Sequence, residues 1–374
     1  MFKTDILFTG FYGFQNTGDD AFVEVASWGA REIWGKQQVR FLSKDNILPE
    51  TVHPSKAYPY RLPKTYRMQL ELLLRNTDYL ISAGGSTIHS KMASSNLKMK
   101  ALDLKKKGRD IKLGGIGVSV GPFKSSSDER AVIDYLKRID FLAVRDQSSY
   151  DFVSNLNLPY QPVRAFDLAA LLPEIYNFDV QRAARDFEEK VIGISVCPYE
   201  SLDGQQDIDR ERIRNRMIVD LIKKLDMQDN IQFNFYIING NNRIGDRFLT
   251  EQTIEKAKPK KYRIINYNKK TRDMWESISE CDFVITTRLH AAIFACFANT
   301  PFMLNEYHRK CADFLSDVGY NNDYRLFNSD YDIDSKANQI LEIVNNSGAY
   351  SKPLATSRMI ELARLNFTSI LISD

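Results

Sequence analysis

The stretch ITTRLHAAIFACFANTP, residues 285–301, carries the clearest structural signal in the sequence. A short β-branched run ends at Thr286 and Thr287, and an almost wholly apolar segment follows. Arg288 and His290 occupy the turn between the two. This order predicts a buried strand, a tight turn and a buried helix, which together form half of a βαβ unit. We therefore expect an α/β fold with a parallel sheet, in which ligands bind where the strands end.

The same alternation of short apolar runs and helical segments extends over most of the chain. In the first half, strands are expected at residues 5–9, 79–83, 111–118, 141–144 and 163–166. In the second half, strands are expected at residues 191–196, 232–238, 263–265, 283–286 and 302–304. A first helix is expected over residues 19–34 and a last one over residues 356–371, each with apolar side chains along one face.

The length and a change in composition indicate two domains. A chain of 374 residues exceeds what one hydrophobic core usually supports. Near residues 172–190 a proline and a charged run precede a fresh strand. We predict two Rossmann-like domains, residues 1–176 and 188–348, that face a ligand-binding cleft. Residues 353–374 are expected to form a C-terminal helix that packs back across the domains.

Composition excludes several classes of protein. Lysine and arginine total 51 against 48 acidic residues, and this net charge of +3 is too small to predict nucleic-acid binding. The N-terminus lacks a signal-peptide pattern, and no apolar run could span a bilayer, so we expect a cytoplasmic protein. The four cysteines form no C-x-x-C pair, which favours reduced, buried thiols over zinc or disulfides.

Arg288 and His290 are the strongest site candidates. A helix N-terminus offers free backbone amides and a positive dipole end, and an arginine fork adds two directed hydrogen bonds to an anion. The alternative is that Arg288 pairs with a core carboxylate while His290 packs as an ordinary buried side chain. Their place between a strand and a buried helix favours anion binding.

A second cluster lies just past the next strand, in NEYHRKCADFL, residues 305–315. Tyr307, His308 and Lys310 are candidates for substrate binding, and the ammonium of Lys310 would act as a point charge on phosphate in the first turn of a helix. Arg309 is equally consistent with a solvated surface.

The first strand is followed by the loop GFYGFQNTGDDA, residues 10–21, which lacks the dinucleotide and Walker fingerprints. Asn16 and Asp19 are candidates for contacts with hydroxyls, and a cap of the following helix is the equal alternative for Asp19. At a later strand end, Gly84, Gly85 and Ser86 are candidate binding residues.

Two pairs of aspartates have the D-x-D spacing that can bind a metal ion. They are Asp207 with Asp209 and Asp332 with Asp334, and both lie in polar, loop-like sequence. Solvated turns explain them better, so no metal requirement is expected.

Read together, seven segments resemble the polysaccharide pyruvyl transferase family in order and spacing. They are GFQNTGDDA, ISAGGST, GIGVSVGP, VRDQSS, FDLAALL, TTRLHAAIFA and YHRKCADFL, and they span roughly residues 5–320. The resemblance implies a glycosyltransferase-B-like pair of domains and phosphoenolpyruvate as co-substrate, with no other cofactor. It also implies a pyruvyl ketal on a sugar of a surface polysaccharide, or exopolysaccharide, as product.

The resemblance also implies roles for individual residues. Arg288 and His290 would hold or activate the donor, and Lys310 would match a lysine of the family. The chemistry of phosphoenolpyruvate further requires an acid, a base and neutralisation of phosphate, for which we assign His290 as the general acid, Asp19 as the base, and Arg288 and Lys310 as the anion clamps. The N-terminal domain would bind the acceptor and the C-terminal domain the donor. One departure is notable, because Cys197 stands where many family members have an arginine.

Two other functions stay open at this stage. A nucleotide-sugar glycosyltransferase of the same fold would use Arg288 and Lys310 for diphosphate and Glu306 for a ribose. An inactive relative that binds glycan would account for Cys197. If the acceptor is a lipid-linked oligosaccharide, peripheral association with the inner membrane face is expected.

Overall fold

The computed structural model describes residues 3–60, 62, 64–177, 189–202, 207–328 and 330–372. The chain divides into two compact units. The first unit contains residues 1–13, 19–175 and 357–374, and the second contains residues 14–18 and 176–356. Of the linker predicted between the two domains, residues 177–187, only residue 177 is among the described residues.

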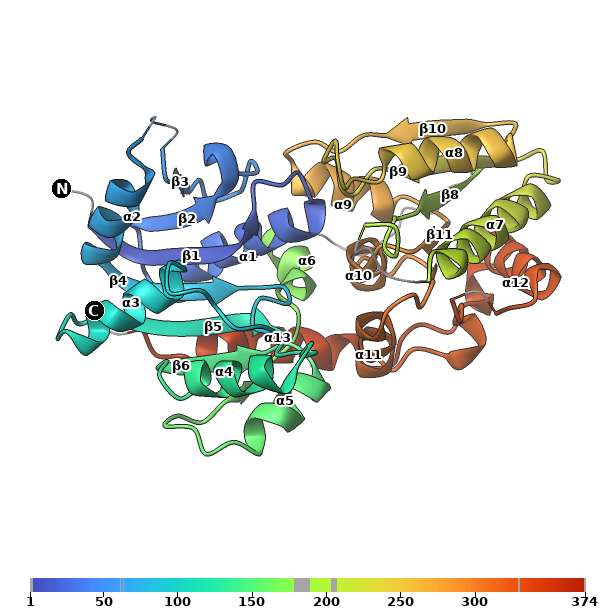
Figure 1. Cartoon of the computed structure of the whole chain (residues 1–374). Coiled ribbons are helices and arrows are strands. Elements are labelled where there is room, and N and C mark those ends of the chain that lie inside the picture. The colour runs from blue at the N-terminus through green and yellow to red at the C-terminus, as the bar shows by residue number, and fades with distance from the viewer. Residues whose placement is uncertain are drawn as a thin grey trace. The chain divides into compact units, whose positions relative to one another are not determined.

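The first unit is built on a seven-stranded parallel sheet with the order β3-β2-β1-β4-β5-β6-β7 (Figure 1). Its strands are β1 (Thr4–Tyr12), β2 (Val39–Ser43), β3 (Lys56–Tyr58), β4 (Thr77–Ala83), β5 (Lys112–Val118), β6 (Phe141–Val144) and β7 (Val163–Arg164). The five strands expected in this half are present. The short strands β2 and β3 were not predicted.

Helices bury apolar side chains against this sheet. They are α1 (Thr17–Glu32), α2 (Tyr66–Arg75), α3 (Leu97–Lys106), α4 (Ser126–Leu136), α5 (Gln147–Ser154), α6 (Leu172–Ile175) and α13 (Thr356–Thr368). Helices α2 to α5 share one core cluster with side chains from β1, β4, β5 and β6. Helix α1 begins at Thr17, two residues before the predicted start.

The C-terminal helix α13 returns to the first unit after the chain has completed the second. The indole of Trp34 donates to the carbonyl of Phe367 at 2.9 Å, and the Phe367 ring packs against Gly29 of α1. The buried side chain of Asn366 accepts from the amide of Gly117 at 2.6 Å and donates to the carbonyl of Phe166 at 2.9 Å. These bonds tie the helix to the ends of β5 and β7.

The second unit has a five-stranded parallel sheet with the order β10-β9-β8-β11-β12. Its strands are β8 (Lys190–Ser195), β9 (Ile231–Tyr236), β10 (Tyr262–Ile265), β11 (Phe283–Thr286) and β12 (Phe302–Leu304), as the sequence predicts. The central strands β8 and β11 are almost wholly buried. Both units therefore follow the Rossmann-like plan of parallel strands joined by helices.

Helices cover both faces of the second sheet. They are α7 (Ile208–Leu225), α8 (Arg247–Ala257), α9 (Thr271–Ser279), α10 (Leu289–Phe297), α11 (Arg309–Asp317) and α12 (Ile333–Asn345). Helix α10 is buried along nearly its whole length, as the apolar run 291–298 predicts. Short 3₁₀ turns complete the chain at Lys44–Asn46, Leu168–Leu171, Asn322–Tyr324 and Ser347–Ala349.

Candidate active site

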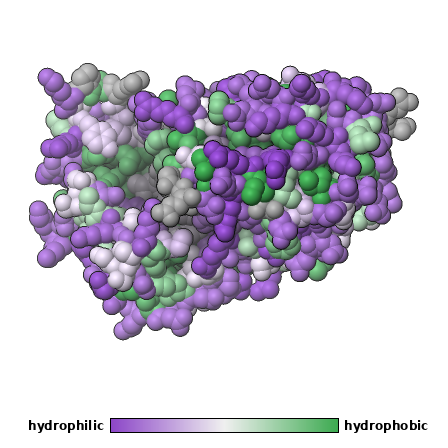
Figure 2. Space-filling view, turned by 45° about the vertical axis from the view of Figure 1, so that its right-hand side comes forward, coloured by the Kyte–Doolittle hydropathy of each residue, from purple (hydrophilic) through white to green (hydrophobic). Residues whose placement is uncertain are grey.

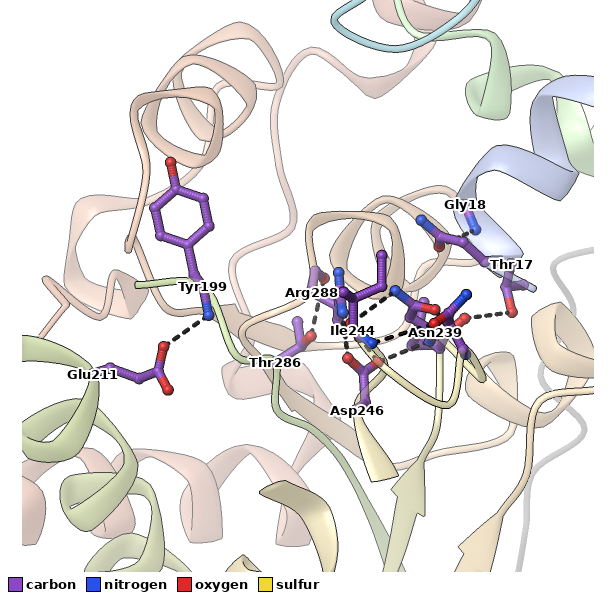
Figure 3. Close-up of polar contacts among 12 residues, drawn as sticks. Thr17, Gly18, Tyr199, Glu211, Asn239, Ile244, Asp246, Thr286 and Arg288 are labelled. Carbon is purple, nitrogen blue, oxygen red and sulfur yellow. Dashed lines mark hydrogen bonds and ion pairs between the residues drawn. The ribbon is translucent and has the colours of Figure 1, made fainter. Parts of the chain in front are cut away.

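Arg288 lies at the end of strand β11, where it occupies the N-cap position of helix α10. Its Nε donates to the two carboxylate oxygens of Asp246 at 2.9 and 3.1 Å, and its Nη2 also donates to Asp246 (Figure 3). Although burial lowers the pKa of the Arg288 guanidinium, the charge of Asp246 raises it overall, so the cation is retained. Nη1 makes no hydrogen bond with any described residue.

Asp246 is the partner that the sequence did not reveal. Its side chain is completely buried, and it also accepts the backbone amide of Asn239 at 2.8 Å. The structure therefore confirms one part of the alternative to anion binding, namely that Arg288 pairs with a core carboxylate. Since the pair engages only one side of the guanidinium, it orients Arg288 and leaves Nη1 able to bind an anion. No local motif in the sequence distinguishes Asp246 as this partner.

Residues 14–18 come from the loop after β1 but belong to the second unit. Thr17 donates its amide and its hydroxyl to the carbonyl of Ile238 at 3.0 and 3.1 Å. The amide of Gly240 donates to the carbonyl of Gln15 at 2.8 Å. Asn16 accepts the amide of Gly18 at 3.2 Å through its side-chain oxygen. The loop that contains Asn16 is thus fixed beside the segment that holds Asp246.

His290 lies in the first turn of α10, and Gly18 packs directly on its imidazole. A Cβ atom placed on Gly18 would lie 2.2 Å from Nδ1 of His290, far inside van der Waals contact. Glycine is therefore required at position 18 for this approach. The histidine is held against the loop that the sequence also singled out.

An aromatic cluster covers the ends of β8 and β12. The rings of Tyr199 and Tyr307 lie 4.9 Å apart, and the imidazole of His308 lies 5.5 Å from Tyr199. The Lys310 ammonium lies 5.5 Å from the centre of the Tyr307 ring. Tyr307, His308 and Lys310 thus lie together, as their neighbouring places in the sequence require, and the structure adds Tyr199, which follows β8 and was not predicted.

Cys197 lies within the same cluster, fully buried, and burial raises the pKa of its thiol. Three cations are close enough to act on this thiol electrostatically: Arg288, Arg214 and Lys310. Arg214 comes from helix α7, which no sequence motif connected with the site. A cation therefore does lie near the position where the family resemblance leads one to expect arginine.

Arg214 is anchored in a buried ionic network. It donates to both carboxylate oxygens of Glu200 at 3.0 and 2.7 Å, and its side chain is completely buried. Glu211 accepts the amides of Tyr199 and Ser201 at 2.8 and 3.1 Å. Figure 3 shows the bond between Glu211 and Tyr199. These contacts fix the turn that presents the Tyr199 ring.

His308 is held in its neutral form with a defined tautomer. Burial, together with the charges of Lys310 and Arg309, lowers the pKa of His308 to about 4. Its Nδ1 accepts the amide of Lys310 at 3.1 Å, so it caps helix α11. The neutral ring must then carry its proton on Nε2, which makes that atom a hydrogen-bond donor.

Two buried hydroxyls lie at the carboxyl ends of neighbouring strands in the second sheet. Ser195 Oγ ends β8 and Thr287 Oγ1 follows β11, and neither makes a hydrogen bond with the described residues. Unsatisfied buried hydroxyls are rare in folded proteins. Water or a polar ligand at the strand ends would satisfy them.

The other predicted residues belong to the first unit. Asp19 is half-buried in the first turn of α1, but it is not the helix cap, because the helix begins at Thr17. Gly84 has a φ of +74°, and a Cβ there would collide with Phe22, so packing alone requires this glycine. Gly85 also has a φ of +74°, and a Cβ there would meet Thr87 and Phe22 only at ordinary contact distances; Ser86 is exposed.

A buried charge network lies at the ends of β5, β6 and β7. Arg145 donates to Asp167 at 2.7 Å and to the hydroxyl of Ser119 at 2.8 Å. Asp146 accepts the amide of Ser149 at 2.8 Å and caps α5. Arg145 and Asp146 therefore do not pair with each other, and Asp146 instead braces the N-terminus of α5.

The structure also bears on the metal question and on the glycosyltransferase alternative. Across the described ranges, no group of three or more His, Cys, Asp or Glu side chains could hold a metal ion. Asp332 caps helix α12 through a bond to the amide of Ser335. Glu306, the residue suggested for a ribose, instead forms a bidentate ion pair with Arg325.

Comparisons with known proteins place this geometry in context. A family model described as polysaccharide pyruvyl transferase matches residues 16–309, most of the chain. A search of curated proteins finds no match.

Many solved structures share the fold. UDP-GlcNAc 2-epimerase from Neisseria meningitidis, bound to UDP-GlcNAc, has a TM-score of 0.54 at 10% identity and covers 97% of this chain and 100% of its own. MnaA from S. aureus, in a co-structure with UDP, has a TM-score of 0.57 at 12% identity and covers 99% of both chains. α,α-Trehalose 6-phosphate synthase from Burkholderia multivorans has a TM-score of 0.53 at 10% identity and covers 100% of this chain and 95% of its own. These likenesses show a glycosyltransferase-B-like fold and nothing about substrate.

Proposed function

Because this chain belongs to the polysaccharide pyruvyl transferase family, a family of enzymes, we propose that it transfers a pyruvyl group from phosphoenolpyruvate to two hydroxyls of one sugar. The single observation that supports this most is Arg288, an oriented guanidinium at a strand end whose Nη1 is left unengaged by the described residues. A second cation, Lys310, lies in the first turn of the next helix. Two cations match a donor that carries both a phosphate and a carboxylate.

The proposed reaction balances as follows. The methylene carbon of phosphoenolpyruvate gains a proton and becomes a methyl group, while the neighbouring carbon forms bonds to two sugar oxygens. The bond from that carbon to the phosphate oxygen breaks, and inorganic phosphate leaves. Of the two hydroxyl protons released, one replaces the proton given to the methyl group and the other goes to phosphate.

We assign the groups by their chemistry. His290 is the general acid toward the methylene carbon, and Arg288 and Lys310 neutralise the donor and the departing phosphate. Neutral His308 donates a hydrogen bond from its Nε2 to the bound substrate. Asn16, Tyr307 and Tyr199 contact the substrates, and Asp19 is the base for the acceptor hydroxyl.

The acceptor is proposed to be a sugar of a surface polysaccharide, carried as a lipid-linked oligosaccharide, with Gly84, Gly85 and Ser86 as its candidate contacts. None of the described helices has the length and apolar character needed to cross a membrane. We propose that the enzyme acts in the cytoplasm, associated peripherally with the inner membrane face, and that it needs neither a metal nor another cofactor.

The decisive experiment is incubation with phosphoenolpyruvate and a panel of synthetic and lipid-linked glycans, followed by mass spectrometry. A mass gain that corresponds to a pyruvyl ketal, with stoichiometric release of phosphate, supports the proposal. Thermal stabilisation by nucleotide sugars but not by phosphoenolpyruvate would instead favour a glycosyltransferase. Binding of glycan without any turnover would favour an inactive relative. Activity that a chelator abolishes and a divalent ion restores would contradict the metal-free reaction.

A further inference from the structure

The loop before helix α2 and the helix itself expose a concentrated set of apolar side chains. The visible surface in Figure 2 is largely hydrophilic, with separate hydrophobic areas. Of the seventeen large apolar side chains exposed among the described residues, five fall within residues 60–72. They are Tyr60, Leu62, Tyr66, Met68 and Leu72, and the most exposed is Met68 at 58%. Single exposed apolar side chains need no explanation, but a cluster does.

Helix α2 shows why these side chains stay outside the core. Its inner face buries Leu70, Leu73 and Leu74 in the core of the first unit. Met68 and Leu72 are four residues apart and therefore neighbours on the outer face of the helix. The outer face of the helix thus mixes apolar with charged side chains, and its apolar members are unnecessary for packing on one sheet.

Two described residues that precede the helix, Tyr60 and Thr65, are bonded to it by one buried side chain. The Gln69 carboxamide accepts the amide of Tyr60 at 2.8 Å and donates to the carbonyl of Tyr60 at 3.0 Å. It also donates to the hydroxyl of Thr65 at 2.7 Å. These bonds hold Tyr60 and Thr65 against the helix.

Cations surround these apolar side chains. Lys64, Arg67 and Arg75 are all exposed, and the only acidic residue between positions 64 and 75 is Glu71. Glu71 pairs with Arg75 at 2.6 Å, which leaves the charges of Lys64 and Arg67 unbalanced. Three cations less one anion give this segment a net charge of +2. A whole-chain charge of +3 conceals this local concentration.

We propose that this α2 surface, formed by Tyr60, Leu62, Lys64, Tyr66, Arg67, Met68, Leu72 and Arg75, docks on an anionic lipid bilayer. Apolar side chains can enter the boundary between headgroups and acyl chains, while the flanking cations bind the negative surface. A second copy of the chain fits less well, because a two-fold interface would set the same cations against each other. The α2 surface therefore recruits the protein to the membrane without needing the acceptor.

The test uses the full chain and vesicles with no glycan. Binding is measured by co-sedimentation with vesicles of phosphatidylcholine alone and with vesicles in which about a third is phosphatidylglycerol. Met68→Ser/Leu72→Ser removes the apolar contacts, and the control is Met227→Ser/Leu354→Ser, which makes the same changes at even more exposed residues of the second unit. Lys64→Gln/Arg67→Gln removes the charge excess, and Lys256→Gln/Arg263→Gln is its matched control.

We expect the unaltered chain to bind anionic vesicles but not neutral ones. Each α2 variant should reduce that binding by about tenfold or more, and each control should leave it unchanged. Circular dichroism should show that all four variants are folded, since every changed side chain is exposed. No preference for anionic vesicles, or equal binding by variants and controls, would overturn the proposal. So would ultracentrifugation that shows a dimer which only the α2 variants dissociate, with vesicle binding unaffected.

Discussion

The guanidinium carbon of Arg214 lies 5.5 Å from the centre of the Tyr307 ring, although Arg214 comes from helix α7 and Tyr307 follows strand β12. Both nitrogens that face Glu200 are bonded to it, and the arginine side chain is fully buried. The aromatic part of the candidate site therefore rests on a buried ion pair that no local pattern indicated.

The first prediction concerns this ion pair. Arg214→Met leaves the buried carboxylate of Glu200 without its partner, so the free energy of unfolding should fall by about 3–5 kcal/mol. The control is Arg212→Met on the same helix, which breaks only an exposed pair with Asp209 and should cost less than about 1 kcal/mol. Urea denaturation measures both. Equal, small losses would show that the burial of Arg214 has been misjudged.

The second prediction tests the anion clamp. Arg288→Lys keeps the charge but loses the planar fork, so the free energy of phosphoenolpyruvate binding should weaken by about 1–3 kcal/mol. Calorimetric titration with phosphoenolpyruvate measures the change. Arg309→Lys, at an exposed neighbouring position, is the control and should bind as the unaltered chain does. Unchanged binding by Arg288→Lys would place the donor elsewhere.

The third prediction separates proton transfer from binding. His290→Asn keeps a similar size and one polar edge but cannot protonate carbon, so turnover should fall by at least about a hundredfold. Donor affinity and melting temperature should change little. Phosphate release and calorimetry supply the two readouts, with His53→Asn, far along the chain, as the control. Near-normal turnover would make His290 a packing residue.

The fourth prediction uses the contact between Gly18 and His290. In Gly18→Ala the new methyl group would lie 2.2 Å from Nδ1, so the imidazole must move. A displacement of this kind can lower turnover by about a hundredfold. Gly348→Ala is the control, because the nearest atom to its new methyl group is 3.2 Å away. Steady-state rates and a crystal structure of Gly18→Ala decide the matter, and an unmoved imidazole with full activity would refute the close contact.

The fifth prediction concerns pH. The pKa of His308 is lowered to about 4 in the folded protein, whereas an unfolded chain has a histidine pKa of about 6.5. Since the unfolded state binds the proton more readily, stability is fully present above about pH 6.5 and is lost as pH falls toward 4. His308→Asn should show a flatter decline over this window, measured by thermal melting at several pH values. Nuclear magnetic resonance should show no titration of the His308 ring between pH 7 and 5.

The positions of most strands along the chain could be predicted, because buried parallel strands are short apolar runs that end in turns. Strands β2 and β3 were missed, and for β3 there is a physical reason. Strand β3 has only three residues and lies at the sheet edge, so it depends on its pairing with β2 rather than on its own sequence. A pattern that short is indistinguishable from a loop until a partner strand is present.

The sequence by itself determined the βα order, the family resemblance and the strand ends where Arg288, His290 and Lys310 lie. Only the tertiary structure decided what these residues contact. Arg288 bonds to Asp246, 42 positions away, and Thr17 bonds to Ile238, 221 positions away. Local patterns record the periodicity of one helix or strand, whereas these partners are selected when separate elements pack. The orientation of Arg288, the neutral ring of His308 and the buried pair beneath Tyr307 therefore depend on burial and proximity that folding creates.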